Sequence, residues 1–183
     1  LELFPGDAET HYQVGNLARQ LGKNDEAVER LTHLVRVNLS PTIGYYLKAH
    51  AQLAEILAKR GELQKSEQVL QKLLRLDSSH AMGREQWVNL MGMQGKQLIE
   101  EGRHAEAAKK LEELARLQPD NFEVKVQHAV ALVRSPDYPA AAKALKGLID
   151  VRSDYLPAYD NLSFVLAQLN RLDEAEQVCL EAL

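Results

Sequence analysis

The stretch Asn170-Arg-Leu-Asp-Glu-Ala175 decides the fold, because it reads as a tight turn that ends one helix and begins the next. Asparagine, like glycine, tolerates the left-handed backbone conformation just past a helix end, and a small residue closes the stretch. The same form occurs four times earlier in the chain, as Gly22-Lys-Asn-Asp-Glu-Ala27, Gly61-Glu-Leu-Gln-Lys-Ser66, Gly102-Arg-His-Ala-Glu-Ala107 and Pro136-Asp-Tyr-Pro-Ala-Ala141. Five copies of one turn predict five hairpins of two helices each.

Apolar residues on both sides of each turn follow helical spacing. They recur four, seven and eight residues after the small residue, as Leu31, Leu34 and Val35 do after Ala27. This spacing puts one apolar stripe along one face of a helix, and a matching stripe precedes each turn. Cys179 stands on the stripe of the last copy, so we expect a buried and unreactive thiol there.

Three places depart from a regular repeat. The first helix of the fourth copy matches best if its turn is one residue short. The stripe expected for that helix is Val126, Ala129, Val130 and Val133. Extra residues precede the second and third hairpins, where we expect Ser40 and Ser79 to cap lengthened helices, the later one reaching Trp87 and beyond.

The spacing of the repeats resembles a known family. The small residues Ala107, Ala141 and Ala175 are evenly spaced, whereas the intervals that separate Ala27, Ser66 and Ala107 are longer. The shorter interval is that of the tetratricopeptide repeat, a helical hairpin of about 34 residues, which the chain resembles. The last repeat matches best, with Tyr159, Leu162, Leu172 and Ala175 at the family's signature spacings, and Pro119 is the closing proline of the third. The resemblance covers essentially the whole chain and implies an all-α fold, a right-handed superhelical solenoid of about five helix-turn-helix hairpins.

The resemblance also divides the chain. We expect a single solenoid over residues 1–183, with residues 1–7 as the tail of a preceding repeat. The expected repeats cover about 8–39, 40–78, 79–121, 122–155 and 156–183. Neither end carries a polar capping repeat, so we expect a fragment of a longer protein.

Composition excludes several classes of function. Hydrophobic residues make up 45% of the chain, charged residues 26% and aromatic residues 5%, and the net charge is -4, which disfavours nucleic acid as a partner. The one cysteine allows no disulfide within the chain, and no apolar run approaches the ~18 residues that span a bilayer. No metal-binding spacing of histidines or cysteines and no phosphate loop is present, so we expect no metal, no cofactor and no enzyme activity. Without a signal-like start, a cytoplasmic location fits and a periplasmic one stays open.

The function implied by the resemblance is a non-catalytic scaffold for protein–protein interaction. Such a scaffold binds a peptide or partner segment in a concave groove lined by the first helix of each hairpin. By family analogy the groove is lined by Tyr12, Gln13, Asn16, Arg19, Lys48, Gln52, Glu55, Lys59, Asn89, Met93, Lys96, Gln127, His128, Arg134, Asp160, Asn161 and Phe164. Mixed charges and few large apolar groups favour a mixed peptide over an apolar helix. Members that grip the C-terminal carboxylate of chaperones use a fixed residue set, of which only Asn16 is present.

Two alternatives to a free-standing scaffold stay open. The chain resembles repeats that act as the regulatory or targeting arm of a larger enzyme or of a polysaccharide-export protein. Alternatively, exposed repeat ends stack copies into a homo-oligomer.

Two pairs of aromatic residues have competing interpretations. His11 and His50 occupy the same repeat position, where the family packs a large aromatic residue, which favours packing over chemistry. Tyr45 and Tyr46 are adjacent on a predicted helix and cannot both face the core. The outward ring either contacts the preceding hairpin or belongs to a partner site.

Overall fold

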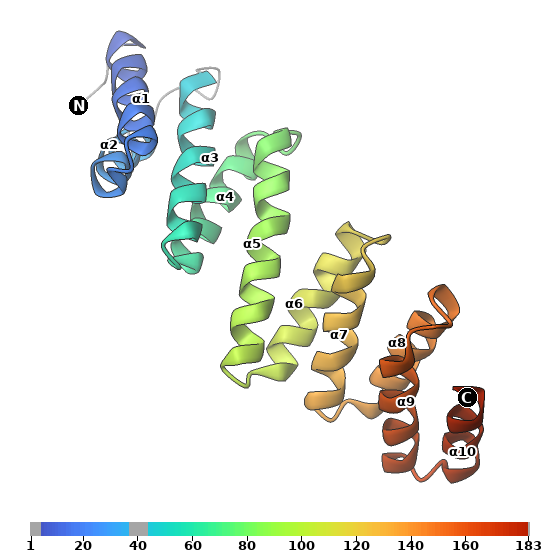
Figure 1. Ribbon diagram of the computed structural model, residues 1–183. Coiled ribbons are helices and arrows are strands. Elements are labelled where there is room, and N and C mark those ends of the chain that lie inside the picture. The colour runs from blue at the N-terminus through green and yellow to red at the C-terminus, as the bar shows by residue number, and fades with distance from the viewer. Residues whose placement is uncertain (1–4, 37–43, 183) are drawn as a thin grey trace. The chain divides into compact units, whose positions relative to one another are not determined.

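The structure, a computed structural model, describes residues 5–36 and 44–182, and within these ranges it contains ten helices and no strand (Figure 1). The helices are α1 Pro5–Gln20, α2 Asn24–Arg36, α3 Gly44–Lys59, α4 Leu63–Leu76, α5 Ala81–Glu100, α6 His104–Leu117, α7 Phe122–Arg134, α8 Tyr138–Val151, α9 Leu156–Gln168 and α10 Leu172–Glu181. The predicted all-α class and the pairing of helices around the five turns are confirmed.

The chain forms two compact units, Leu1–Leu90 and Met91–Leu183, and the boundary falls within α5. In the first unit α1 packs on α2 and α3 packs on α4, while α3 also contacts both α1 and α2. In the second unit α6 to α10 pack in chain order, each on the next. The division into repeats stays a prediction, and α1 begins at Pro5, before the predicted start of the first repeat at residue 8. Residues 1–4 of the predicted tail and the predicted cap Ser40 lie outside the described residues.

One hydrogen-bond pattern closes every hairpin. The backbone N–H of the residue that follows the left-handed position bonds back across the turn. Lys23 donates to the Ala18 carbonyl at 2.9 Å, and Arg171 donates to the Leu166 carbonyl at 2.9 Å. Gly22, Gly61, Gly102 and Asn170 have φ angles of 72°, 77°, 74° and 57°, the left-handed conformation that the turn requires. The turn chemistry predicted for these residues is confirmed.

The fourth turn is not shortened, so the predicted register of α7 is wrong. The Asp137 backbone N–H donates to the Leu132 carbonyl at 3.2 Å, the same bond that closes the other turns. The Asp137 carboxylate also accepts from the Ala140 N–H at 3.3 Å and caps α8. These two bonds fix a turn of normal length. As a result Ala129 and Leu132 are buried, whereas Val133 is only half-buried.

The helices of a hairpin cross at small residues. Ala27, Ser66, Ala107 and Ala141 have no exposed surface, as the repeat pattern predicts. The Ser66 hydroxyl donates to the Ala54 carbonyl at 2.7 Å, which satisfies the one polar group among them. Leucines that follow these residues in the stripe complete the core of each hairpin.

The predicted cap at Ser79 is wrong. The Ser79 N–H and hydroxyl both donate to the Asp77 carboxylate, at 2.9 and 2.7 Å, which holds Ser79 in the turn before the helix. The His80 ring instead caps α5, because its Nδ1 accepts from the Gly83 N–H at 3.1 Å. The predicted length of the helix is confirmed, since α5 runs for 20 residues and continues well past Trp87.

The predicted burial of Cys179 is also wrong, because its side chain is exposed. The neighbouring Val178 takes the buried position on α10. Among the described residues α10 packs mainly on α9, and its Glu174 also lies 3.7 Å from Lys146 of α8. Cys179 lies on the face of α10 that these contacts leave exposed.

Two glycines of α5 offer a matched test of the close helix crossing. A Cβ on Gly95 would lie 2.8 Å from Leu111 Cδ2 and 3.0 Å from its Cγ, whereas one on Gly92 would lie 3.7 Å from Leu114 Cδ2. We expect Gly92→Ala to stabilise the protein by about 0.5–1 kcal/mol, because alanine favours helices. We expect Gly95→Ala to be less stable than Gly92→Ala by about 1–3 kcal/mol through overpacking. Urea unfolding measures the free energy of unfolding of each variant. Equal values for Gly92→Ala and Gly95→Ala would contradict the close approach of α5 and α6 at Gly95.

His50 is a core residue, as predicted. It has no exposed surface, and its Nδ1 lies 2.9 Å from the Tyr46 carbonyl, which only accepts, so Nδ1 carries the proton. The other ring nitrogen, Nε2, is buried without a hydrogen-bond partner. Burial lowers the pKa of His50, and the nearby Lys72 ammonium acts in the same direction. His11 packs as well, with its ring stacked on His33 at 4.7 Å between ring centroids.

This buried histidine makes stability depend on pH. The pKa of His50 is lower in the folded chain than its ordinary value of 6.5, so on acidification the unfolded chain takes up the proton first. The stability that neutral His50 contributes to the folded chain is fully present above the ordinary pKa of 6.5 and declines as the pH falls below it. We expect the melting temperature of the wild type to fall more between about pH 7.5 and 5.5 than that of His50→Leu. A His128→Gln variant controls for the other histidine whose pKa burial lowers, and parallel pH profiles of wild type and His50→Leu would contradict the assignment.

Candidate functional site

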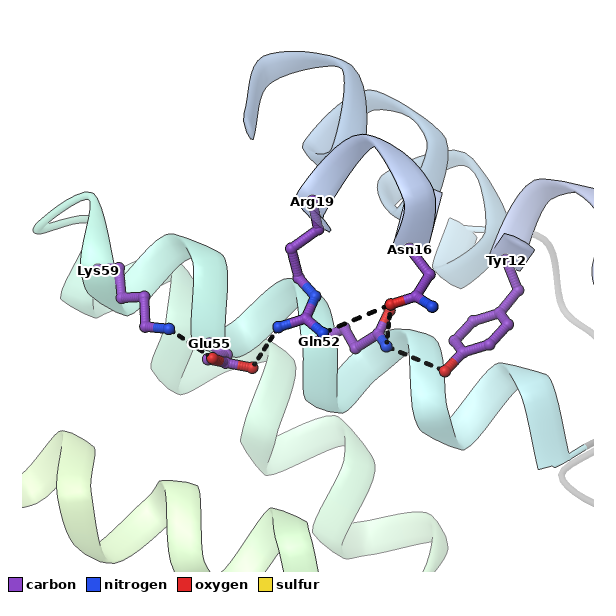
Figure 2. Close-up of polar contacts among 6 residues, drawn as sticks. All are labelled: Tyr12, Asn16, Arg19, Gln52, Glu55 and Lys59. Carbon is purple, nitrogen blue, oxygen red and sulfur yellow. Dashed lines mark hydrogen bonds and ion pairs between the residues drawn. The ribbon is translucent and has the colours of Figure 1, made fainter. Parts of the chain in front are cut away.

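Six of the predicted groove residues form a polar ladder between α1 and α3, called the α1/α3 face below. They are Tyr12, Asn16 and Arg19 of α1 and Gln52, Glu55 and Lys59 of α3, and Figure 2 shows them meeting across the two helices. The Gln52 side-chain amide donates to the Tyr12 hydroxyl at 3.0 Å and to Asn16 Oδ1 at 3.1 Å. The sequence predicts that these residues share a face, but not that they bond to one another.

Charges continue the ladder. Arg19 donates to Asn16 Oδ1 at 3.5 Å and lies 3.6 Å from Glu55 Oε2, while Lys59 donates to Glu55 Oε1 at 2.6 Å. Glu55 therefore holds a cation on each side. Such partly exposed pairs contribute little stability, so their main effect is to fix where the charged groups lie.

Tyr45 lies at the other end of this face, and the structure shows one of the two contacts that the sequence left open for it. Its hydroxyl donates to Glu9 Oε1 at 2.8 Å, and its ring lies 5.4 Å from the ring of Tyr12. The outward tyrosine thus contacts the preceding hairpin, whereas Tyr46 is buried. The bond to Glu9 raises the pKa of Tyr45, because it stabilises the neutral phenol. The Lys48 ammonium lies 5.9 Å from the Tyr45 ring centroid.

Two polar atoms of the ladder are left without a partner. Gln52 Oε1 and Arg19 Nε are both buried and form no hydrogen bond within the described residues. The residues that carry them are only half-buried, and the Arg19 side chain is 33% exposed. Native proteins satisfy nearly all buried polar atoms, so this acceptor and this donor each require a partner, which is either water or a ligand.

The remaining predicted residues of the first unit lie outside the ladder. Gln13 of α1 and Asn89 of α5 are exposed, and neither forms a hydrogen bond within the described residues. Sequence register places them on the first helices, but no contact within this unit ties them to the α1/α3 face.

In the second unit the predicted residues are dispersed. Met93 and Lys96 are exposed on α5, and Asp160 is exposed on α9. Phe164 keeps 49% of its surface and meets the Tyr138 ring edge-on at 6.3 Å.

Three further predicted residues of this unit make only local contacts. Asn161 donates to the Pro157 carbonyl at 2.7 Å, and Gln127 donates to Glu123 at 3.2 Å. Arg134 lies beside the turn that joins α5 to α6. None of these contacts brings the three residues together into one surface.

His128 lies in a cavity of about 750 Å³ lined by α6, α7, α8 and the turn that joins α7 to α8. Lys109, Lys125 and Lys143 also line the cavity, and the sequence did not predict them as site residues. A signal was available, because Lys125 precedes the small residue Ala141 by the same interval as His50 precedes Ser66. Burial lowers the pKa of His128.

Neither a metal cluster nor a membrane span is found within the described ranges. No group of three or more histidine, cysteine, aspartate or glutamate side chains there is arranged to hold a metal ion. No helix there is both long and apolar enough to cross a bilayer.

Comparisons with known proteins agree with the geometry. Family models of the tetratricopeptide repeat match residues 12–81, 98–163 and 156–183. A sequence search of curated proteins finds no match. Among solved structures, MamA matches with a TM-score of 0.57 at 14% identity, covering 98% of this chain and 92% of MamA. MamA from Desulfovibrio magneticus RS-1 matches with 0.52 at 17% identity over 96% and 93% of the two chains. YrrB, described as a tetratricopeptide-repeat protein with an unusual peptide-binding site, matches with 0.56 at 14% identity over 94% and 82%.

The repeated hairpins define the class, an all-α helical-repeat scaffold for protein interaction. The chain belongs to the tetratricopeptide-repeat family. Members of this family are typically non-catalytic.

A double-mutant cycle tests the ladder. We expect Tyr12→Phe and Gln52→Met to couple by about 0.5–1.5 kcal/mol in the free energy of unfolding, because together they remove one hydrogen bond. Gln13→Met is the matched control, since Gln13 neighbours Tyr12 in sequence but does not bond to it. Its coupling to Tyr12→Phe should lie within about 0.5 kcal/mol of zero. Equal coupling in both cycles would show that the bond to Gln52 is not formed.

Proposed function

We propose that this chain is a non-catalytic adaptor that holds an extended peptide of a partner protein along the α1/α3 face. The observation that carries the proposal is the pair of buried, unpartnered atoms in the ladder, Gln52 Oε1 and Arg19 Nε. One lacks a donor and the other lacks an acceptor.

A peptide backbone supplies both missing groups. Each peptide unit carries one N–H donor and one carbonyl acceptor, so an extended peptide offers a donor to the unpaired oxygen and an acceptor to the unpaired N–H. Because Gln52 and Arg19 are only half-buried, a small side-chain rotation presents these atoms to a ligand. A wholly apolar helix would leave both atoms unsatisfied at a cost of about 1–3 kcal/mol each.

The two ends of the face suit different side chains of the peptide. Tyr12 and Tyr45 form an aromatic pair at one end, where an apolar or aromatic side chain packs. Arg19, Glu55 and Lys59 form a charged group at the other end, where both signs of charge find a partner. A peptide that carries both apolar and charged side chains fits the two ends of this face better than a uniformly charged peptide. The description of YrrB as a peptide-binding protein of the same fold supports a peptide as ligand.

The proposal is tested by selecting peptides and then removing the unpartnered atoms. Random peptides displayed on phage are selected on the wild-type chain, and the enriched peptides are measured by fluorescence anisotropy. We expect Gln52→Met and Arg19→Met each to weaken binding about three- to ten-fold, because each removes a hydrogen bond to the peptide. Met keeps much of the length of both side chains, so packing changes little.

Gln13→Met is the control for this experiment, since Gln13 is exposed on α1 and outside the ladder. It should leave the affinity unchanged, and thermal melts of all variants should show that each is folded. The proposal fails if the selection returns no binding peptide, or if the enriched peptides bind the Gln52→Met/Arg19→Met double variant as tightly as the wild type.

A further inference from the structure

The cavity in the second unit is formed by an exchange of packing residues in one repeat. Tyr159 and Leu162 of α9 precede the small residue Ala175, and both are buried. Counted back in the same way from Ala141, the corresponding residues of α7 are Lys125 and His128, and both are only half-buried. Two residues that complete the core in the fifth repeat are therefore replaced by polar side chains, which leave space beside them.

Small residues on the flanking helices keep that space open. Ala105 and Ala108 of α6 line it together with Ala144 and Gly147 of α8, and the resulting cavity has a volume of about 750 Å³. A Cβ built on Gly147 meets no atom within 4 Å. The lining runs from Ala105 to Glu112 along α6, which is ~10 Å at 1.5 Å per residue. This is the length of about three residues of extended peptide.

The charged groups around the cavity are unequally engaged. Its two carboxylates already have partners, because Glu112 binds Arg116 at 2.7 Å and Asp137 caps α8. Lys109, Lys125 and Lys143 line the same cavity, and none of them forms a hydrogen bond or ion pair within the described residues. Lys109 acts at longer range on the Glu106 carboxylate and lowers its pKa, after the bond from Arg103, the largest cause. The cavity thus presents three cations that no ion pair holds, above an apolar floor that includes Leu132 and Leu148.

We infer that this cavity is a second binding site, separate from the α1/α3 face, which takes a short acidic segment of a partner protein. A glutamate or aspartate carboxylate reaches the unpaired lysines, and the aliphatic part of the segment packs on the alanines of α6 and α8. Charge complementarity favours an acidic occupant, because hydrogen bonds to charged groups are the stronger ones. The length of the lining favours a peptide segment over a single small anion.

Peptide selection on a variant tests this site independently of the proposed function. The bait is Gln52→Met/Arg19→Met, in which the α1/α3 face is altered and the cavity is intact. We expect the enriched peptides to contain aspartate or glutamate, and their affinity to fall as salt rises. Replacing the essential glutamate of a peptide by glutamine should weaken binding about five-fold or more.

Two lysines of α8 provide the matched control. Lys143 lines the cavity, whereas Lys146, further along the helix, lies 3.7 Å from Glu174 outside it. Lys143→Gln should weaken binding of the acidic peptide about five-fold or more, and Lys146→Gln should not. Gly147→Leu should also abolish binding, because it fills the cavity without changing any charge, and it should not lower the melting temperature, because leucine favours helices.

Several outcomes would overturn the inference. One is a set of enriched peptides without acidic residues, and another is equal loss of affinity in Lys143→Gln and Lys146→Gln. Tighter binding of inorganic phosphate or of a single-stranded oligonucleotide than of the acidic peptide, with the same dependence on Lys143, would assign the cavity to a different ligand. Failure of the α1/α3 proposal would leave this result unaffected, since the bait already lacks that face.

Discussion

The close crossing of the two helices in each hairpin is the constraint on which the rest of the structure depends. It requires a small residue at the crossing, such as the fully buried Ala27 or Ala107, and a turn closed by a backbone bond from a turn residue to the last turn of the first helix. Together they fix the rotation of the first helix relative to the second. Every residue of the first helix is then assigned to the hairpin core, to the neighbouring hairpin or to solvent. The α1/α3 face and the cavity beside α7 both follow from this assignment.

Local chemistry explains why so much of the fold could be predicted from the sequence. A left-handed Gly22 or Asn170, a small residue five positions later and an apolar stripe after it are all properties of short segments. The wrong predictions arose where an adjacent residue takes the capping position or where burial depends on the packing of a neighbouring helix. Asp77 holds Ser79 in the turn before α5, so His80 caps that helix, and Cys179 lies on an exposed face of α10.

The candidate sites were predictable to different degrees for the same reason. Position within the repeat places Tyr12, Asn16 and Gln52 on one face, because that depends only on helix geometry. The bonds among them depend on side-chain rotamers and on the distance between two helices, neither of which a sequence pattern specifies. The register of α7 was misjudged because its valines suggested a stripe, while Asp137 held the turn at its normal length. This error hid the fact that Lys125 occupies a packing position.

The two surfaces also differ in how they relate to stability. On the α1/α3 face, Gln52 and Arg19 make internal bonds and leave one atom each unpaired, so the face is largely ordered before any ligand arrives. A preordered surface loses less conformational entropy on binding. Around α7 the apolar contacts themselves are reduced, and a ligand there would replace packing that the neighbouring repeat makes internally.

The replacement of two packing residues in α7 has a consequence for how such chains diversify. In a helical-repeat protein each unit contacts only its neighbours, so the stability lost in one unit is not transmitted along the array. One repeat is thus free to exchange core side chains for charged ones while the hairpins around it, with residues such as Tyr159 still buried, keep the fold. Mutation can therefore create a recognition site within a single repeat, and the modular architecture limits the damage to that repeat.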